Sequence, residues 1–396
     1  MAIRLLPDPR GLPRAFAWLF VGTLVNRLGT FVVPFLAIYL SEQEHFSVEK
    51  TSFVVGLVGV GSIFSGPVGG ALADRIGRRA TMVLATTAGA ATMVALGFAR
   101  DVTSICAAAF ALGFANDLYR PALGAVVADV VPEPLRARAY GLLHWAVNVG
   151  FALGPALAGF LAARSYSYLF FGDAATSLAC GILVAIAIPE TRPTAKHGEA
   201  KPSLLTPYTD PAFLAFVSLS LLLAIAFFQG FVALPLHMRA HGISAKAYGL
   251  LLGLNGLLIV LFQPVLVSAI EKSSRAKVAA ASALFTGIGW GMTGLAGSSH
   301  LVYALAITVW TIGEILMAPL TPAIVADLSP PLLRGSYQGA FQISFGAASA
   351  IAPLIGGFVL EHFGSSVLWG GCAVAGVVSA AGFLVVVPLA DKRRAR

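Results

Sequence analysis

The sequence predicts an all-α membrane protein whose twelve transmembrane helices form two repeats of six. Three observations predict it: few charged residues, a series of apolar segments of membrane-spanning length, and a direct repeat between the two halves. Of the 396 residues, 58% are hydrophobic and 11% are charged, and the mean hydropathy is +0.85. Soluble domains carry about 25% charged residues, so this chain has too few charges to cover a surface in water.

Twelve apolar segments are each long enough to cross about 30 Å of hydrocarbon, which takes about 20 residues. They cover residues 15–40, 51–73, 80–99, 103–128, 138–162, 166–189, 211–236, 247–270, 278–297, 301–327, 336–360 and 366–389. The basic start of the chain runs directly into the first segment, so we expect that segment to remain as an anchor and not as a cleaved signal. Cys106, Cys180 and Cys372 lie inside apolar segments and read as small core residues.

The net charge of +8 is carried by residues between the apolar segments. In a soluble protein such a charge would suggest a nucleic-acid partner, but here we expect none. With both termini in the cytoplasm, 19 of the 26 Lys and Arg residues lie in cytoplasmic segments, five lie in outer loops, and Arg27 and Arg120 lie within spans. This excess of inner positive charge predicts cytoplasmic termini.

The long polar segment at residues 190–210 divides the chain into two six-span halves, residues 1–189 and 211–396. The halves repeat each other without a gap across two spans. Adding 198 to Arg120–Pro132 gives Ala318–Pro330, which pairs Asp129 with Asp327. The same offset pairs Arg136 with Arg334, Gly141 with Gly339, Pro155 with Pro353, and Gly159 with Gly357.

The loop after the second apolar segment reads Gly69-Gly70-Ala71-Leu72-Ala73-Asp74-Arg75-Ile76-Gly77-Arg78-Arg79. It resembles the loop between helices 2 and 3 of major facilitator superfamily transporters, Gly-x-Leu-Ala-Asp-Arg-x-Gly-Arg-Arg/Lys. The resemblance implies a major facilitator fold with a substrate site between the halves at mid-membrane. It also implies a cytoplasmic gate, formed by Gly70, Asp74, Arg75, Gly77, Arg78 and Arg79 with Asp129 and Asp327. In the second half, the segment from Glu271 to Lys277 keeps the charge but lacks the equivalent of Asp74.

Four ionisable residues lie near the middle of predicted spans: Arg27, Asp117, Arg120 and Glu314. A charge inside a membrane span costs a few kcal/mol, so each is a candidate functional residue. Asp117 and Arg120 are three residues apart and can pair on one helix face. Two positive and two negative charges cancel, which also fits a static buried ion network. The family resemblance implies that helices 1, 4, 7 and 10, which carry these residues, line the central cavity. Asp173 and Gln263 are also polar within spans, but no motif assigns them.

Glu314 lies in Gly313-Glu314-x-x-x-x-Pro319, which resembles the helix 10 element of some proton-coupled multidrug exporters and peptide transporters. The resemblance implies that Glu314 carries the coupling proton, with Asp117 as its rival. Asn26-Arg27-Leu28-Gly29 resembles a helix 1 Glu-Arg element of peptide transporters, but Asn26 replaces the acid, which disfavours a peptide substrate. The predicted substrate cavity comprises Asn26, Arg27, Asn116, Arg120, His144, Asn148 and Gln229.

Gly141, Gly150, Gly154, Pro155 and Gly159 lie on the fifth span. Their spacing resembles the glycine-proline element of the antiporter branch, except that Ala158 replaces one glycine. Glycines four apart form a groove for a neighbouring helix, and proline bends the span. Ordinary close packing would use the same residues, and only the resemblance associates them with export.

These patterns predict a proton-coupled antiporter that exports small, lipophilic or drug-like molecules by alternating access. The alternatives are a proton-coupled importer of a sugar, organic acid or peptide, a lipid flippase, and a transporter-like receptor. No nucleotide-binding loop, metal-ligand spacing or nucleophile constellation is apparent, so we expect neither an enzyme nor a cofactor nor a metal site. The expected partners are a small-molecule substrate, protons and lipid. The expected form is a monomeric, multi-pass protein of the bacterial plasma membrane.

Overall fold

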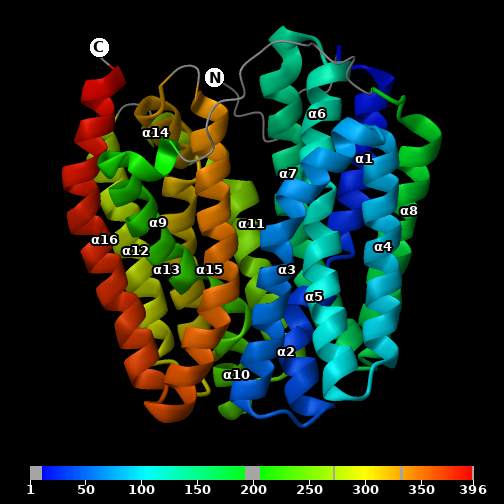
Figure 1. The fold of residues 1–396 in the computed structure, drawn as a ribbon. Coiled ribbons are helices and arrows are strands. Elements are labelled where there is room, and N and C mark those ends of the chain that lie inside the picture. Colours follow the sequence, from blue (N-terminus) through cyan, green and yellow to red (C-terminus); the bar gives the residue numbers. More distant parts are fainter. Residues whose placement is uncertain (1–10, 192–205, 271–272, 331–332, 395–396) are drawn as a thin grey trace. The chain divides into compact units, whose positions relative to one another are not determined.

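The computed structural model describes residues 11–191, 206–270, 273–330 and 333–394, and these residues form helices and turns without a strand (Figure 1). The first half contains α1 (Arg14–Leu28), α2 (Val32–Glu42), α3 (Val48–Arg75), α4 (Arg78–Phe98), α5 (Val102–Leu118), α6 (Arg120–Val130), α7 (Glu133–Ala162) and α8 (Ser167–Ala187). The second half contains η1 (Thr206–Thr209), α9 (Pro211–Phe228), η2 (Gln229–Phe231), α10 (Ala233–Ala240), α11 (Ala245–Ile270), α12 (Arg275–Thr293), α13 (His300–Met317), α14 (Leu320–Leu328), α15 (Arg334–His362) and α16 (Ser365–Arg394).

Eleven segments of the described chain are long and apolar enough to cross a membrane, one fewer than the sequence predicted. The missing one is α12, which occupies the predicted span 278–297. This 19-residue helix begins with Arg275 and Lys277 and contains several small and polar residues, which lower its hydropathy. The eleven spans nevertheless make the protein a multi-pass membrane protein. Cys180 and Cys372 are buried, as predicted for small core residues, whereas Cys106 is only partly buried.

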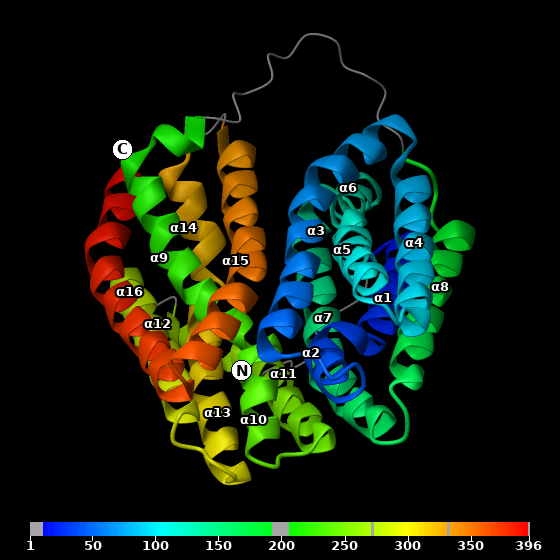
Figure 2. The ribbon, with the colours of Figure 1, turned by 60° about the horizontal axis from the view of Figure 1, so that its bottom comes forward.

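The helices group into two compact units. Unit 1 comprises Met1–Ala195 with Ser244–Val260, and unit 2 comprises Lys196–Ile243 with Leu261–Arg396. Each unit has its own apolar core. One core in unit 1 includes Phe16, Leu19 and Met82, and one in unit 2 includes Phe213, Phe216 and Phe383. Figure 2 shows α9, α14 and α16 close together within unit 2.

The first part of α11 belongs to unit 1, although the repeat places it in the second half of the sequence. Tyr248 explains part of this grouping, because its hydroxyl donates a hydrogen bond to the carbonyl of Pro34 at 3.1 Å. The ring of Tyr248 also meets the ring of Phe35 edge to face at 5.3 Å. A side chain at Gly249 would overlap the carbonyl oxygen of Pro155, so the backbones of α11 and α7 touch there.

Four of the predicted spans are interrupted helices. The first is divided into α1 and α2, the fourth into α5 and α6, the seventh into α9, η2 and α10, and the tenth into α13 and α14. The interruptions follow the repeat to within a few residues. They lie at residues 29–31 and 229–232 in the first and seventh spans, where an offset of 198 from the first would give 227–229. They lie at residue 119 and residues 318–319 in the fourth and tenth spans, where the offset would give 317. Pro121 and Pro319 occupy equivalent positions beside two of the breaks, where proline removes a helical N–H donor.

The repeat also appears in local hydrogen bonds. The Tyr140 hydroxyl donates to the Gly124 carbonyl, and the side-chain amide of Gln338 donates to the Pro322 carbonyl, both at 3.0 Å and 198 residues apart. The side chain of Asp101 caps α5 by accepting from the N–H of Ser104, and the side chain of Ser299 caps α13 by accepting from the N–H of Val302. The two halves therefore share side-chain contacts as well as a sequence pattern.

Candidate functional site

The three charged residues predicted for the first half gather at two helix interruptions of unit 1. Arg27 lies in the last turn of α1, and one of its terminal nitrogens donates a hydrogen bond to the Tyr119 hydroxyl between α5 and α6. The Nε of Arg27 is buried without a hydrogen-bond partner in the described part of the chain. Asp117, in the last turn of α5, forms the predicted ion pair with Arg120, with a distance of 2.6 Å between Oδ1 and Nε.

Asp173 is a further charged residue near Arg27 that the sequence motifs did not assign. It lies on α8 and is 2% exposed. Its Oδ2 accepts hydrogen bonds from the backbone N–H groups of Phe31 and Val32, both at 3.1 Å, where α2 begins. Arg27 is close enough to interact electrostatically with the carboxylate. An ionisable residue inside a span was the signal available in the sequence.

The asparagines predicted for the cavity differ in their contacts, and one of them joins two helices. The side-chain amide of Asn26 donates to the Ser177 hydroxyl on α8 at 3.1 Å. The side-chain amide of Asn148 donates to the His144 carbonyl one turn earlier, at 3.0 Å. The side-chain oxygen of Asn116 lies close to Gly89 on α4. His144 is exposed.

Gln229 requires a correction. It is 1% exposed, so it does not line open space in this structure. Its side-chain amide donates to the Ala352 carbonyl on α15 at 2.9 Å. Gly356 leaves the room for this contact, because a Cβ there would lie 2.8 Å from the amide carbon of Gln229. Gln229 therefore anchors the interruption of the seventh span to α15.

Glu314 lies in unit 2, in the last turn of α13, and is partly buried. One turn earlier, Trp310 stacks on Trp290, which in turn stacks on Trp369, with ring centroids 5.2 and 5.7 Å apart. The preceding Gly313 is packed against α12, where the Ser282 hydroxyl donates to the Gly313 carbonyl at 2.6 Å. Close packing of α12 and α13 explains the glycine and fixes the backbone beside Glu314.

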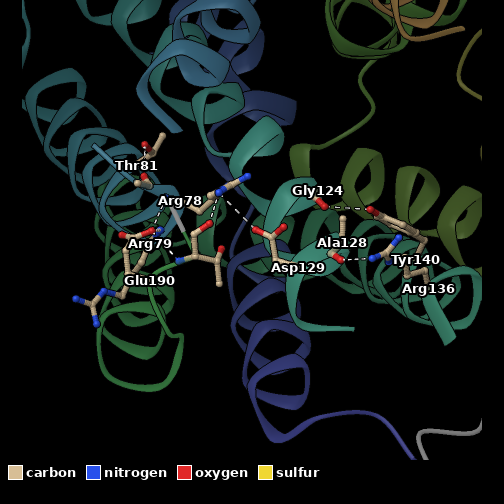
Figure 3. A network of polar contacts seen from close by, with 11 residues as sticks. Arg78, Arg79, Thr81, Gly124, Ala128, Asp129, Arg136, Tyr140 and Glu190 are labelled. Atoms are coloured by element: carbon tan, nitrogen blue, oxygen red, sulfur yellow. Dashed lines mark hydrogen bonds and ion pairs between the residues drawn. The ribbon is translucent and has the colours of Figure 1, made fainter. Parts of the chain in front are cut away.

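Figure 3 shows a second polar cluster, where α3 turns into α4. The Arg78 guanidinium contacts the Thr191 carbonyl and lies 3.5 Å from the Asp129 carboxylate. Glu190, at the end of α8, accepts hydrogen bonds from the backbone N–H groups of Arg78 at 2.7 Å, Arg79 at 3.4 Å and Ala80 at 3.3 Å. The cluster thus joins α4, α6 and the chain after α8.

Glu190 is the residue of this cluster that the sequence did not reveal. Burial alone would raise its pKa, but hydrogen bonds from the N–H groups of Ala80, Arg79 and Arg78 outweigh it and hold the pKa below its usual value. The carboxylate also explains Gly77, whose φ is +101°. A Cβ at Gly77 would overlap the carboxylate of Glu190.

The other predicted gate residues vary in their surroundings. Arg75 and Arg79 have exposed side chains. A Cβ added at Gly70 would meet no atom of the described residues within 4 Å. The side chain of Asp74 lies outside the described residues. Arg136 donates to the carbonyls of Val131 at 3.2 Å and Ala128 at 2.6 Å, which satisfies the end of α6.

Unit 2 contains a matching cluster around Arg275. One terminal nitrogen of Arg275 lies 2.7 Å from the Asp327 carboxylate and 2.8 Å from the Asp391 carboxylate. Asp327 is the repeat equivalent of Asp129, and Asp391 comes from the end of α16 as Glu190 comes from the end of α8. The second half therefore keeps the ion cluster although its loop sequence has diverged.

The glycine-proline element of the fifth span is a packing surface of α7. Gly150 lies against Arg27, since a Cβ there would be 2.7 Å from the carbonyl carbon of Arg27. A Cβ at Gly154 would lie 3.3 to 3.6 Å from the carbonyl oxygens of Arg27, Leu28 and Thr30. Gly159 faces the backbone of Lys246 at 3.0 Å. Gly141 has open space around it.

Comparisons with known proteins agree with this architecture. A family model for the Major Facilitator Superfamily matches residues 19–244 and 214–396. The chain is 28% identical to the uncharacterized MFS-type transporter YttB of Bacillus subtilis (strain 168), covering 89% of this chain and 90% of YttB. It is 27% identical to a Na(+), Li(+), K(+)/H(+) antiporter of Planococcus maritimus, covering 82% and 84%. It is 22% identical to the multidrug resistance protein MdtH of Salmonella arizonae (strain ATCC BAA-731 / CDC346-86 / RSK2980), covering 87% and 85%.

Solved structures share the fold. A POT family transporter in complex with 5-aminolevulinic acid superposes with a TM-score of 0.80 at 17% identity, covering 99% of this chain and 100% of the other. The nucleoside transporter NupG (D323A mutant) gives a TM-score of 0.79 at 15% identity, covering 94% and 99%.

Proposed function

Because the chain belongs to the major facilitator superfamily, we propose that it is a secondary transporter that exports small lipophilic molecules in exchange for protons. The observation that carries the proposal is that spans 1, 4, 7 and 10 are all interrupted, with Arg27, Asp117, Arg120 and Glu314 beside the interruptions. Secondary transporters bind substrates and coupling ions at such discontinuous helices. Alternating access would then be carried out by a monomer in a bacterial plasma membrane.

Glu314 is the proposed proton carrier. Its repeat equivalent, Asn116, cannot titrate, and Asp117 is compensated by Arg120. Asp173 adds a carboxyl beside Arg27 within unit 1, next to the Asp117–Arg120 pair. A proton or a cationic substrate would each neutralise the carboxylate of Glu314, so the two would compete, as exchange requires.

Export is favoured by the relatives. One is named a multidrug resistance protein and another a cation/proton antiporter, and both match over more than four fifths of this chain. A quinolone resistance protein, NorA of Staphylococcus aureus (strain MSSA476), is 23% identical over 49% of the chain and 50% of its own length. The peptide and nucleoside transporters share the fold alone. The importer remains the alternative that the direction of transport would identify.

The test measures ethidium and norfloxacin movement in inverted membrane vesicles in which an imposed pH gradient is the driving force. Wild-type protein is expected to accumulate at least one of the two probes. Glu314→Gln, which mimics the protonated acid, is expected to abolish accumulation and to weaken binding of the cationic ethidium. Glu361→Gln, which changes an exposed acid on α15, is the control and should accumulate normally. Gradient-driven accumulation by Glu314→Gln would contradict the role of Glu314, and substrate movement in the opposite direction would support an importer.

A further inference from the structure

The interruption of the first span is held by a side chain from a distant helix. α1 ends at Leu28 and α2 begins at Val32. The backbone N–H groups of Phe31 and Val32 both donate to Oδ2 of Asp173 on α8, at 3.1 Å. Asp173 is 2% exposed, so these bonds are shielded from solvent. A backbone donor left unsatisfied in a membrane is costly. Asp173 removes that cost for Val32, and it is a second acceptor for Phe31, whose N–H also donates to the Gly29 carbonyl at 2.8 Å.

Residues around Asp173 fix the other side of the same interruption. Gly29 is packed against Thr176, because a Cβ at Gly29 would overlap the Thr176 side chain. The Thr176 hydroxyl donates to the Asp173 carbonyl at 3.0 Å. The Asn26 amide donates to the Ser177 hydroxyl at 3.1 Å. One face of α8 therefore contacts both the last turn of α1 and the first turn of α2.

Arg27 is confined between this face and α7. Its backbone carbonyl carbon would lie 2.7 Å from a Cβ at Gly150, so α7 touches it directly. Its guanidinium contacts the Tyr119 hydroxyl. The charged groups that act on Arg27 are Asp117 on α5 and Asp173 on α8. The position of the Arg27 side chain therefore depends on where α1 ends. Asp173 fixes the start of α2, the next helix.

An ordinary helix start would not need Asp173. Capping oxygens usually come from the residue just before the helix, and Thr30 stands close to that position. Its hydroxyl instead donates to the Asn26 carbonyl at 3.3 Å. The acceptor used is a carboxyl oxygen 141 and 142 residues away in sequence, and Arg27 is close enough to that carboxyl to interact with it. Capping from α8 ties the start of α2 to the helix that also faces Arg27.

We propose that Asp173 is a positioning residue for transport, because it fixes the interruption of the first span and thereby sets the place of Arg27. The inference rests on the proposed function, because it assumes that Arg27 contributes to substrate binding. A single oxygen accepts both N–H groups, so Asp173→Asn should preserve the arrangement and Asp173→Ala should lose it.

The experiment compares Asp173→Asn, Asp173→Ala, Arg27→Ala and the double variant Asp173→Ala/Arg27→Ala in the full-length protein. The readouts are KM and maximal rate for norfloxacin, and amide hydrogen exchange in a peptide that contains Phe31 and Val32. Asp101→Ala is the matched control, since Asp101 also caps a helix, α5, by accepting from Ser104 at 2.9 Å, but it does so at an exposed loop.

Asp173→Ala is expected to accelerate exchange at Val32 at least tenfold, with a smaller effect at Phe31, which keeps its bond to the Gly29 carbonyl. It should also raise KM about as much as Arg27→Ala. The double variant should have the same KM as Arg27→Ala, because both substitutions remove the same contribution, that of Arg27 to substrate binding. Asp173→Asn should stay within about threefold of wild type in KM, and Asp101→Ala should not change KM.

The inference is overturned if Asp173→Ala lowers only the yield or unfolding temperature while KM stays at the wild-type value. It is also overturned if the KM effects of Asp173→Ala and Arg27→Ala multiply, because the two residues then act separately. If Arg27→Ala leaves KM unchanged, the proposed role of Arg27 fails. Exchange at Val32 then decides the inference without a transport measurement. Faster exchange in Asp173→Ala but not in Asp173→Asn supports the fixed interruption, and equal exchange rates in the two variants refute it.

Discussion

The carboxylate of Glu190 accepts a hydrogen bond from the backbone N–H of Arg78 at 2.7 Å and so joins the end of α8 to the start of α4. α4 begins after Gly77, which has no side chain to cap its own helix. Glu190 supplies the missing acceptor to Arg78, Arg79 and Ala80. An acid at a helix N-terminus is also favoured by the helix dipole. The arginines of the loop are therefore held by a residue that lies 112 positions after Arg78.

Glu190→Ala should lower the free energy of unfolding by about 1 kcal/mol, the usual effect of losing a helix cap, and less if solvent replaces the exposed carboxylate. Glu190→Gln keeps an acceptor oxygen and should lose about half as much or less. Thermal unfolding in detergent at pH 7 measures both. An alanine variant as stable as wild type would show that water caps α4 equally well.

The same residue predicts a pH dependence. Because the folded protein holds the pKa of Glu190 below its usual 4.5, its contribution is complete above pH 4.5 and is lost as the pH falls through the folded pKa. The stability difference between wild type and Glu190→Gln should therefore be constant from pH 7 to 5 and shrink below pH 4.5. A difference that grows on acidification would contradict the assignment.

Gly77→Ala should destabilise the protein by about 1–2 kcal/mol, because a side chain at positive φ is strained. The new Cβ would also overlap the Glu190 carboxylate. Gly70→Ala, in the same motif but with open space around the position, is the control and should retain or slightly increase stability. Unfolding temperatures that fall equally in the two variants would show that neither φ nor Glu190 explains Gly77.

His237 predicts a second pH dependence. It lies in α10, one residue beyond the predicted span 211–236 and after the membrane-spanning segment Pro211–Phe231. Burial, followed by the nearby His241, lowers its pKa from 6.5 to about 4, and its buried Nε2 has no hydrogen-bond partner among the described residues. The unfolded chain binds a proton at higher pH than the folded one, so stability should fall as the pH drops from about 6.5 to about 4. His237→Gln should flatten this decline, whereas His300→Gln, at the exposed start of α13, should leave it unchanged. An unaltered pH profile in His237→Gln would refute the prediction.

Arg275→Lys should destabilise unit 2 by about 1–2 kcal/mol, because hydrogen bonds to charged groups are lost. The two carboxylates lie 2.7 and 2.8 Å from the same terminal nitrogen of Arg275. The shorter lysine side chain places its ammonium nearer the backbone, so it cannot reach both from the same position. Arg79→Lys, at an exposed position of the equivalent loop, is the control and should be neutral. Hydrogen exchange in peptides that contain Asp327 of α14 or Asp391 of α16 would show where the structure loosens. If both variants were as stable as each other, a positive charge at residue 275 would be enough to hold the cluster.

The sequence predicted the helical class, the repeat and the residues beside the interruptions, because those features are local or periodic. Apolar length shows where a span lies, and an offset of 198 needs no structure to be recognised. Asp117 and Arg120 were predictable as a pair because they are three residues apart on one helix. Gly313 and Gly77 could be marked as special, but the neighbours that require a glycine were not predictable.

Partners that are distant in sequence could not be predicted. Glu190 and Asp173 both cap a helix that begins more than 100 residues earlier, and neither distance leaves a pattern in one sequence. Gln229 was misassigned because a polar residue inside a span looks the same whether it faces a substrate or a neighbouring backbone. The interruptions of spans 1 and 7 were hidden because hydropathy continues across them, and Pro34 and Pro235, which lie two residues inside α2 and α10, are not unusual in membrane helices.

Gly150→Ala tests whether the glycines of α7 serve the interruption of the first span or only general packing. A Cβ there would overlap the Cβ of Arg27 and lie 2.7 and 2.8 Å from its carbonyl carbon and oxygen. Backbone atoms cannot rotate away as a flexible side chain can, so α7 and α1 would have to separate, at a cost of about 1–3 kcal/mol. Gly141→Ala, on the same helix with open space around it, should be neutral or stabilising by up to about 1 kcal/mol. Because Gly150 touches Arg27, its variant should also raise KM for the transported probe, whereas Gly141→Ala should not. Loss of stability in Gly150→Ala with an unchanged KM would mean that the element packs helices without setting the place of Arg27.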